Sequence, residues 1–184
     1  MLTTALIYAV HMAIAISESR KRITDFLENN KVGVLATCSN AGMPYAATVY
    51  ITFDQDLNIY FVTRKETRKN RNLHDNGQAA IAIYNATSQA TLQAEGGAIE
   101  VTDPAKMQWV FNDIWKIASQ TSPANQPPQT QLIGAGTYVA YKLAAPSLRL
   151  ATYTQQSSAN PEQIFSVVPT REETHFNAYD KNIN

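Results

Sequence analysis

The sequence predicts a mainly β protein, an antiparallel barrel of six or seven strands with flanking helices. Short runs rich in β-branched and aromatic residues recur at hairpin spacing, and turn residues separate them. After residue 30, one long segment has helical periodicity. Many short strands with few helices are typical of a barrel. A chain of 184 residues is long enough to build one such domain around a substantial core.

The first sixteen residues are interpreted as an apolar N-terminal extension. No charged side chain occurs from Leu2 to Ile16, but fifteen residues are fewer than the roughly twenty that a membrane span needs. A signal peptide would carry a basic residue before its apolar run, and none precedes Arg20. We therefore expect an additional helix that packs on the body or on a second subunit. A biological start at Met12 is the alternative.

The elements that follow are predicted from local periodicity. A short helix is expected over 17–30, because Ile23, Phe26 and Leu27 recur at helical spacing. A second short helix or a turn is expected over 67–73, after the third strand. The strands are predicted over 32–37, 45–53, 57–62, 79–84, 91–101, 137–143 and 148–152.

A longer helix begins at Asp103 and Pro104, which suit the cap and the first helical position. Its buried face is predicted to consist of Met107, Val110, Phe111, Ile114, Trp115 and Ala118. The barrel domain thus spans 17–154, and the polar tail over 155–184 is expected to be irregular.

Composition excludes several function classes. Fifteen basic and fifteen acidic side chains cancel, so no overall field favours nucleic acid or an anionic membrane. Cys38 is the only cysteine, which suits a reducing compartment, and we expect the cytoplasm. The three histidines lack the spacing of metal ligands, so no metal site is predicted.

One basic segment stands out, from Thr63 to Leu73. It contains five of the fifteen Lys and Arg residues and directly follows an apolar strand. The hydroxyls of Thr63 and Thr67 are interleaved with these cations. Several donors converging on one dianion, with charge assistance, are what a phosphate monoester needs. Composition alone favours ordinary solvated charges, but the place of these residues after a strand, with the two threonines beside them, favours a phosphorylated small molecule.

The order of motifs resembles that of the pyridoxamine 5'-phosphate oxidase-like FMN-binding split-barrel proteins. After the helix come V-G-V-L-A-T, G-x-P-Y-A-A-T-V-Y, N-I-Y-F-V-T, T-R-K-x-x-N-L and A-A-I-A-I-Y. The resemblance runs from about Ile23 to Val101 and more weakly to Thr152. It implies a split barrel and a homodimer with the flavin at the subunit interface.

The resemblance also implies a set of cofactor-binding positions. The phosphate would be held by the end of the third strand and the segment after it, and the flavin ring would lie along the second strand. A polar contact that is Gln in the oxidase is taken here by Thr91. The candidate residues are Ala47, Thr48, Val49, Tyr50, Thr63, Arg64, Thr67, Arg68, Lys69 and Thr91.

One departure separates this chain from the oxidase proper. The oxidase ends in an R-L-H-D-R-like run that recognises its product, whereas 146–152 here contain no His, no Asp and no second Arg. The resemblance is therefore to the general-stress and uncharacterised branch. We expect an FMN-dependent oxidoreductase acting on an unidentified small molecule, with the flavin doing the chemistry and no catalytic side chain identified.

Three alternatives remain open at this point. One is a non-catalytic flavin binder that serves as a sensor or stress protein. Another keeps the fold and binds deazaflavin or haem. The third is an interaction module whose basic segment binds an acidic partner without any cofactor.

Overall fold

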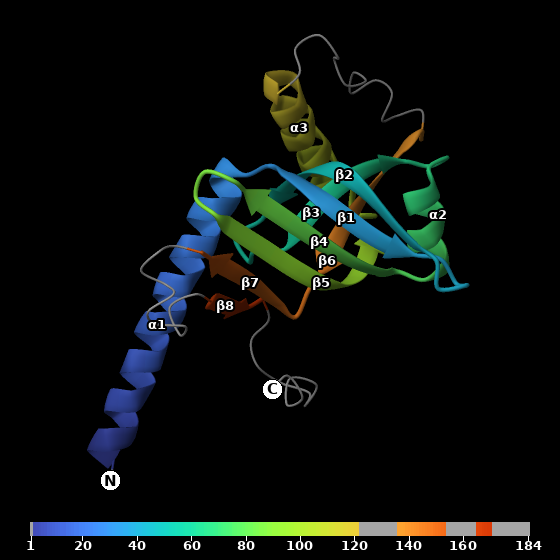
Figure 1. Cartoon of the computed structure of the whole chain (residues 1–184). Helices are drawn as coiled ribbons and strands as arrows, with labels where there is room; N and C mark the ends of the chain where they lie inside the picture. Colours follow the sequence, from blue (N-terminus) through green and yellow to red (C-terminus); the bar gives the residue numbers. More distant parts are fainter. Residues whose placement is uncertain (1, 122–135, 154–164, 171–184) are drawn as a thin grey trace.

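The structure, a computed structural model, describes residues 2–121, 136–153 and 165–170 (Figure 1). Three helices flank a single antiparallel sheet in this part of the chain. The helices are α1 (Leu2–Asn29), α2 (Arg68–Asp75) and α3 (Pro104–Thr121). The strands are β1 (Val32–Cys38), β2 (Pro44–Phe53), β3 (Ile59–Arg64), β4 (Gln78–Asn85), β5 (Ala90–Glu100), β6 (Tyr138–Ala144), β7 (Ser147–Thr152) and β8 (Phe165–Pro169).

The sheet closes into a barrel. Its strand order is β4-β1-β2-β3-β6-β5-β7-β8, and β4 pairs with β5 as well as with β1. Six strands therefore form the barrel, while β7 and β8 continue the sheet from β5. The predicted antiparallel barrel is confirmed, and the predicted strands lie within two residues of their observed bounds.

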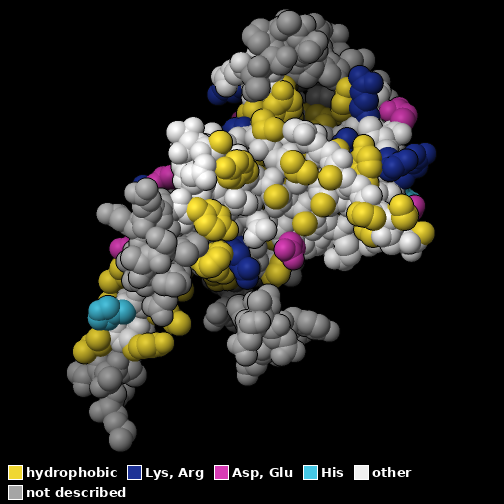
Figure 2. Space-filling model, viewed as in Figure 1, with side chains coloured by type: hydrophobic (Ala, Val, Ile, Leu, Met, Phe, Trp, Pro, Cys, Tyr) yellow, Lys and Arg dark blue, Asp and Glu magenta, His cyan; other side chains and the backbone are white. Residues whose placement is uncertain are grey.

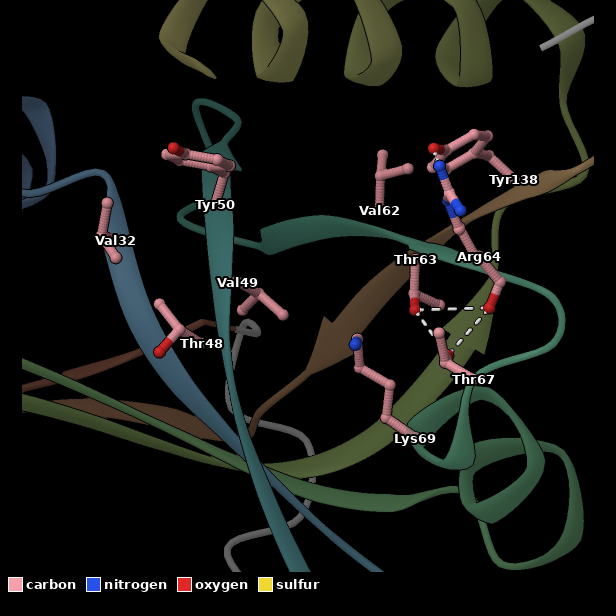
Figure 3. Close-up of a pocket in the computed structure, with 10 residues that line it drawn as sticks. All are labelled: Val32, Thr48, Val49, Tyr50, Val62, Thr63, Arg64, Thr67, Lys69 and Tyr138. Atoms are coloured by element: carbon pink, nitrogen blue, oxygen red, sulfur yellow. Dashed lines mark hydrogen bonds between the residues drawn. The ribbon is translucent and has the colours of Figure 1, made fainter. Parts of the chain in front are cut away.

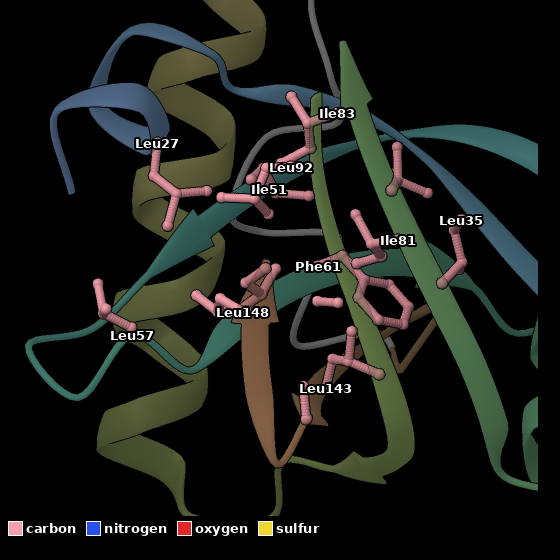
Figure 4. Packing of buried hydrophobic residues seen from close by; sticks show 14 of the residues in the cluster. Leu27, Leu35, Ile51, Leu57, Phe61, Ile81, Ile83, Leu92, Leu143 and Leu148 are labelled. Carbon is pink, nitrogen blue, oxygen red and sulfur yellow. The ribbon is translucent and has the colours of Figure 1, made fainter. Parts of the chain in front are cut away.

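The barrel interior follows from the two-residue period of its strands. In β1, Leu35 points inward and is buried, whereas Val34 points outward and is exposed. The inward side chains meet in one apolar cluster (Figure 4). Within this cluster Phe61 stacks on Tyr141 with ring centroids 5.6 Å apart. Each fully buried large aliphatic side chain stabilises the fold by roughly 1.5–3 kcal/mol.

A close backbone approach holds β5 against the end of β6. A Cβ atom at Gly96 would lie 2.4 Å from the carbonyl oxygen of Ala144, whereas one at Gly97 would meet nothing within 4 Å. Only a residue without a side chain fits at Gly96. The neighbouring glycine has no such requirement.

Helix α3 covers a second, smaller cluster on the outside of the barrel. Val110 and Phe111 pack there on Tyr60 of β3 and Ala140 of β6. Tyr60 also donates a hydrogen bond to Asp54, with 2.7 Å between the oxygens. Burial and this carboxylate raise the pKa of Tyr60. The prediction that Trp115 is a core residue is wrong, because it lies at the edge of this face and is 39% exposed.

The N-terminal region is one continuous helix rather than two segments. At its C-terminal end Ile23 and Leu27 are buried in the barrel core, but residues 6–18 are all exposed in the single chain. Residues 6–16 of the extension therefore do not pack on the described part of the body. No helix in the described part of the chain is long and apolar enough to cross a membrane.

The C-terminal tail contains a strand that the sequence analysis did not predict. β8 pairs with β7 along its length, from Ser147 opposite Pro169 to Ala151 opposite Phe165. The expectation of an irregular tail is wrong for these five residues. The rest of the segment over 155–184 lies outside the described residues, apart from Thr170.

Candidate functional site

A pocket of about 450 Å³ opens on the outer side of the barrel, beside the N-terminal end of α2 (Figure 3). Its volume is in the range of small-molecule sites. β1, β2, β3, β6 and the start of α2 all contribute side chains. The lining residues are Val32, Thr48, Val49, Tyr50, Val62, Thr63, Arg64, Thr67, Lys69 and Tyr138.

Two threonine hydroxyls meet at one end of the pocket. The Oγ1 atoms of Thr63 and Thr67 are 2.9 Å apart, and Thr67 donates to the carbonyl oxygen of Arg64 at 2.8 Å. Thr67 is also the N-cap of α2, because its Oγ1 accepts from the backbone N–H of Asn70. A bound anion would therefore meet the hydroxyls and the positive end of a helix together.

Two cations flank these hydroxyls. Lys69 is half-buried, and desolvation lowers the pKa of its ammonium. Arg64 is exposed; its Nε donates to the hydroxyl of Tyr138 at 2.7 Å, and its guanidinium lies 5.4 Å from the centre of that ring. Within the described residues, no carboxylate lies within 4.0 Å of either cation. Both charges are thus available to an anionic ligand.

Buried hydrogen bonds fix the position of α2. The side-chain amide of Asn72 donates to the Oγ1 of Thr37 in β1 at 3.1 Å, and both residues are buried. Tyr141 of β6 donates to the Oδ1 of Asn70 at 2.8 Å. The helix is tied to two sides of the barrel, so Thr67 and Lys69 are held in place before any ligand arrives.

The other end of the pocket is mostly apolar. Thr48 and Tyr50 project outward from β2, and Val32 and Val62 stand on the neighbouring strands (Figure 3). Together they form an extended wall away from the cations. The pocket therefore has one end suited to an anion and one suited to a flat apolar group.

Seven of the ten predicted cofactor residues line this pocket: Thr48, Val49, Tyr50, Thr63, Arg64, Thr67 and Lys69. Three do not. Ala47 pairs with Leu35 of β1 and is not among the lining residues. Arg68 is exposed, with its guanidinium 5.3 Å from the ring centre of Tyr45. Thr91 pairs with Tyr84 of β4, beyond β1. The binding roles of all ten residues stay predictions.

Three further residues line the pocket without having been predicted from the sequence: Val32, Val62 and Tyr138. The two valines resemble any other strand valine and give no chemical signal. Tyr138 stands directly opposite Arg64 only because β6 pairs with β3. A long-range pairing of this kind has no local signature in the sequence.

The closed six-stranded barrel with an outer pocket places the protein in the split-barrel class, whose fold is common among flavin-binding proteins. Residues 19–144 match the family model described as Pyridoxamine 5'-phosphate oxidase. The chain belongs to this family, as its motifs indicated. None of the curated protein sequences matches the chain.

Solved structures with the same fold are distant in sequence. General Stress Protein 26 from Bacillus anthracis is 18% identical, with TM-score 0.53, and the match covers 71% of this chain and 92% of that one. An FAD-binding protein from Mesorhizobium loti is 16% identical, with TM-score 0.53 and coverage of 71% and 92%. A heme binding protein from Mycobacterium smegmatis is 18% identical, with TM-score 0.57; the match covers 85% of this chain but 58% of that protein. These likenesses show the fold alone.

Proposed function

We propose that this chain is an FMN-binding flavoprotein that acts as an oxidoreductase on a small molecule. The observation that carries the proposal is the two-ended pocket. Thr63, Thr67 and Lys69 gather beside the start of α2, and an apolar wall extends from them along β1 and β2. A phosphate monoester joined to a flat ring system matches this arrangement of donors and apolar surface.

The residues have separate roles in this proposal. Lys69 and Arg64 neutralise the phosphate, and the two threonine hydroxyls rotate their hydrogens toward its oxygens. Tyr50 and Val32 exclude water from the face of the ring. When bound, FMN supplies hydride or electron transfer. The described residues that line the pocket include no carboxylate, imidazole or thiol, so we assign no general acid or base to them.

The proposal includes a homodimer with the cofactor at its interface. The outer face of β1 and its neighbours is apolar where an isolated barrel would be polar: Val34 is exposed beside Thr48 and Ala82, and Ala36 lies beside Ala46. Figure 2 shows hydrophobic side chains spread over this face of the barrel. The face is continuous with the pocket through Val32, so a second copy on it would enclose the ring.

The experiment that tests the cofactor assignment is the visible absorption spectrum of the purified protein, before and after addition of FMN. Flavin bands that stay with the protein through gel filtration support the proposal. If the protein does not bind FMN but binds deazaflavin or haem, the assignment of FMN as the cofactor is wrong, although the fold is unaffected. If the protein binds none of the three, the result favours the alternative of an interaction module that has no cofactor.

Catalysis needs a separate measurement on the FMN-loaded protein. Reduction of the bound flavin by a nicotinamide nucleotide, followed by reoxidation with turnover, supports an oxidoreductase. Bound FMN with no turnover, including with pyridoxamine phosphate, supports the flavin-binding sensor or stress protein instead.

The dimer is tested by Val34→Glu, which places a charge in the centre of the apolar face. The expected result is a lower mass in solution by light scattering and a weaker affinity for FMN. The matched control is Gln93→Glu on β5, a position that is also exposed and outward-facing but is already polar. An unchanged affinity of Val34→Glu for FMN contradicts this interface, whereas an unchanged mass alone does not, because contacts through another element can keep two copies together.

A further inference from the structure

The N-terminal half of α1 is an apolar rod that nothing in the described chain covers. It extends away from the barrel to the N-terminus (Figure 1). Seven large hydrophobic side chains between residues 6 and 16 are 42–70% exposed. They are Leu6, Ile7, Tyr8, Val10, Met12, Ile14 and Ile16. Hydrophobic side chains are also seen along this helix in Figure 2.

The apolar side chains occupy more than one side of the helix. Leu6, Val10 and Ile14 recur every four residues and form what we term the ridge. Met12 and Ile16 form a second apolar row, on the side that continues toward the buried Ile23. The remaining side carries Tyr8, His11 and Ala15, which we term the stripe. A helix that is apolar over most of its circumference is normally buried.

A lipid surface does not suit this segment. Helices that lie in a membrane interface need a strongly charged face, and residues 2–17 contain no charged side chain. The apolar run is also short for a span, and no described helix is long and apolar enough to cross a membrane. An acidic or basic protein partner would find no complementary charge here either.

A second copy of the same segment has the required chemistry and an area of the required order. At about 100 Å² for each large, half-exposed side chain, the six outside the stripe present on the order of 600 Å², below but of the same order as the ~800 Å² that each partner contributes to a standard interface. An uncharged helix meets no like-charge repulsion when it pairs with itself. Two-fold pairing of one surface with its own copy is the commonest arrangement in homo-oligomers.

We propose that residues 6–16 of α1 are a self-association surface that packs on the same segment of another copy. The ridge supplies the contact, and the stripe faces solvent. His11 suits that position, because its ring nitrogen Nδ1 already lies 2.8 Å from the carbonyl oxygen of Ile7 in its own helix. The surface lies on a different element from the pocket and from the barrel face. It therefore does not depend on flavin binding.

The test compares two triple variants of the full chain, each adding three glutamates to the same helix. The ridge variant is Leu6→Glu, Val10→Glu and Ile14→Glu. The stripe variant is Tyr8→Glu, His11→Glu and Ala15→Glu. Both are made in the wild-type chain and in the Val34→Glu chain, so that α1 contacts are seen separately from barrel contacts. Mass is measured by sedimentation, and helix content by circular dichroism.

The expected result is that the ridge variant raises the dissociation constant of the α1 contact more than about a hundredfold, because three buried aliphatic side chains are replaced by charges. In the Val34→Glu chain it should yield a monomer, while the stripe variant keeps the larger mass. Equal masses for the two variants in the Val34→Glu chain overturn the proposal. So does flotation with vesicles of neutral and anionic lipid that the wild type shows and the ridge variant loses, since that assigns α1 to a lipid surface.

Discussion

Replacing Lys69 with alanine is the sharpest test of the anion end of the pocket. Its ammonium is half-buried and, within the described residues, has no carboxylate within 4.0 Å, so a bound phosphate would be its partner. A charge-assisted hydrogen bond contributes about 1.5–3 kcal/mol. Its loss should therefore weaken FMN binding by about ten- to a hundredfold.

The same substitution should leave the folded state nearly as stable as before. Burial lowers the pKa of Lys69 in the folded protein, so the charged amine costs folding free energy near pH 7 instead of contributing it. Removing it ends that cost while losing some packing of the side-chain stem. Affinity should thus fall while the urea midpoint changes little.

The assay is quenching of flavin fluorescence, titrated with FMN and with riboflavin, which lacks the phosphate. Lys69→Ala should weaken the binding of FMN and leave that of riboflavin unchanged. Lys65→Ala is the matched control, because Lys65 belongs to the same basic segment but is exposed and outside the pocket. Unchanged FMN affinity, or an equal loss for both ligands, refutes the assignment.

Three further outcomes are expected. Burial lowers the pKa of Lys69 below its ordinary value of 10.5, and FMN affinity should fall as pH rises through this lowered pKa, because the phosphate favours the protonated amine. The FMN affinity of Lys69→Arg should not change with pH over this range. Gly96→Ala should destabilise the protein by about 1–3 kcal/mol in urea, because its Cβ would meet the backbone of β6, whereas equal stability of Gly96→Ala and Gly97→Ala would contradict this. Asn72→Ala should cost about 1–3 kcal/mol and also weaken FMN binding, and an unchanged FMN affinity would show that this bond does not position α2.

The barrel could be predicted because its signals are local. Short runs rich in β-branched and aromatic residues mark the strands, and turn residues separate successive strands. The anion end of the pocket could be predicted for a similar reason. Thr63, Thr67 and Lys69 fall within seven consecutive residues, so one strand end and one helix start bring them together.

What could not be predicted depends on tertiary structure. The polar residues over 17–19 suggested a boundary, yet no Pro or Gly occurs before Gly33, so nothing ends α1 there. Serines at or near the surface are tolerated in a long helix. β8 is only five residues long and is stabilised by pairing with β7. Trp115 sits at the margin of a helical face, where periodicity does not separate buried from exposed positions.

The pairing of β3 with β6 sets the order of events as the chain is synthesised. Arg64 and Tyr138 are directly opposite each other, although 73 residues lie between them. A nascent chain that has emerged only as far as α3 would contain the threonines and Lys69 but would lack one wall of the pocket. Closing so long a loop is slow, because the chain loses conformational entropy before the contacts between β3 and β6 form and compensate for that loss. A ligand that needs both walls would therefore bind only after synthesis has passed β6, and would then hold the closed barrel against reopening.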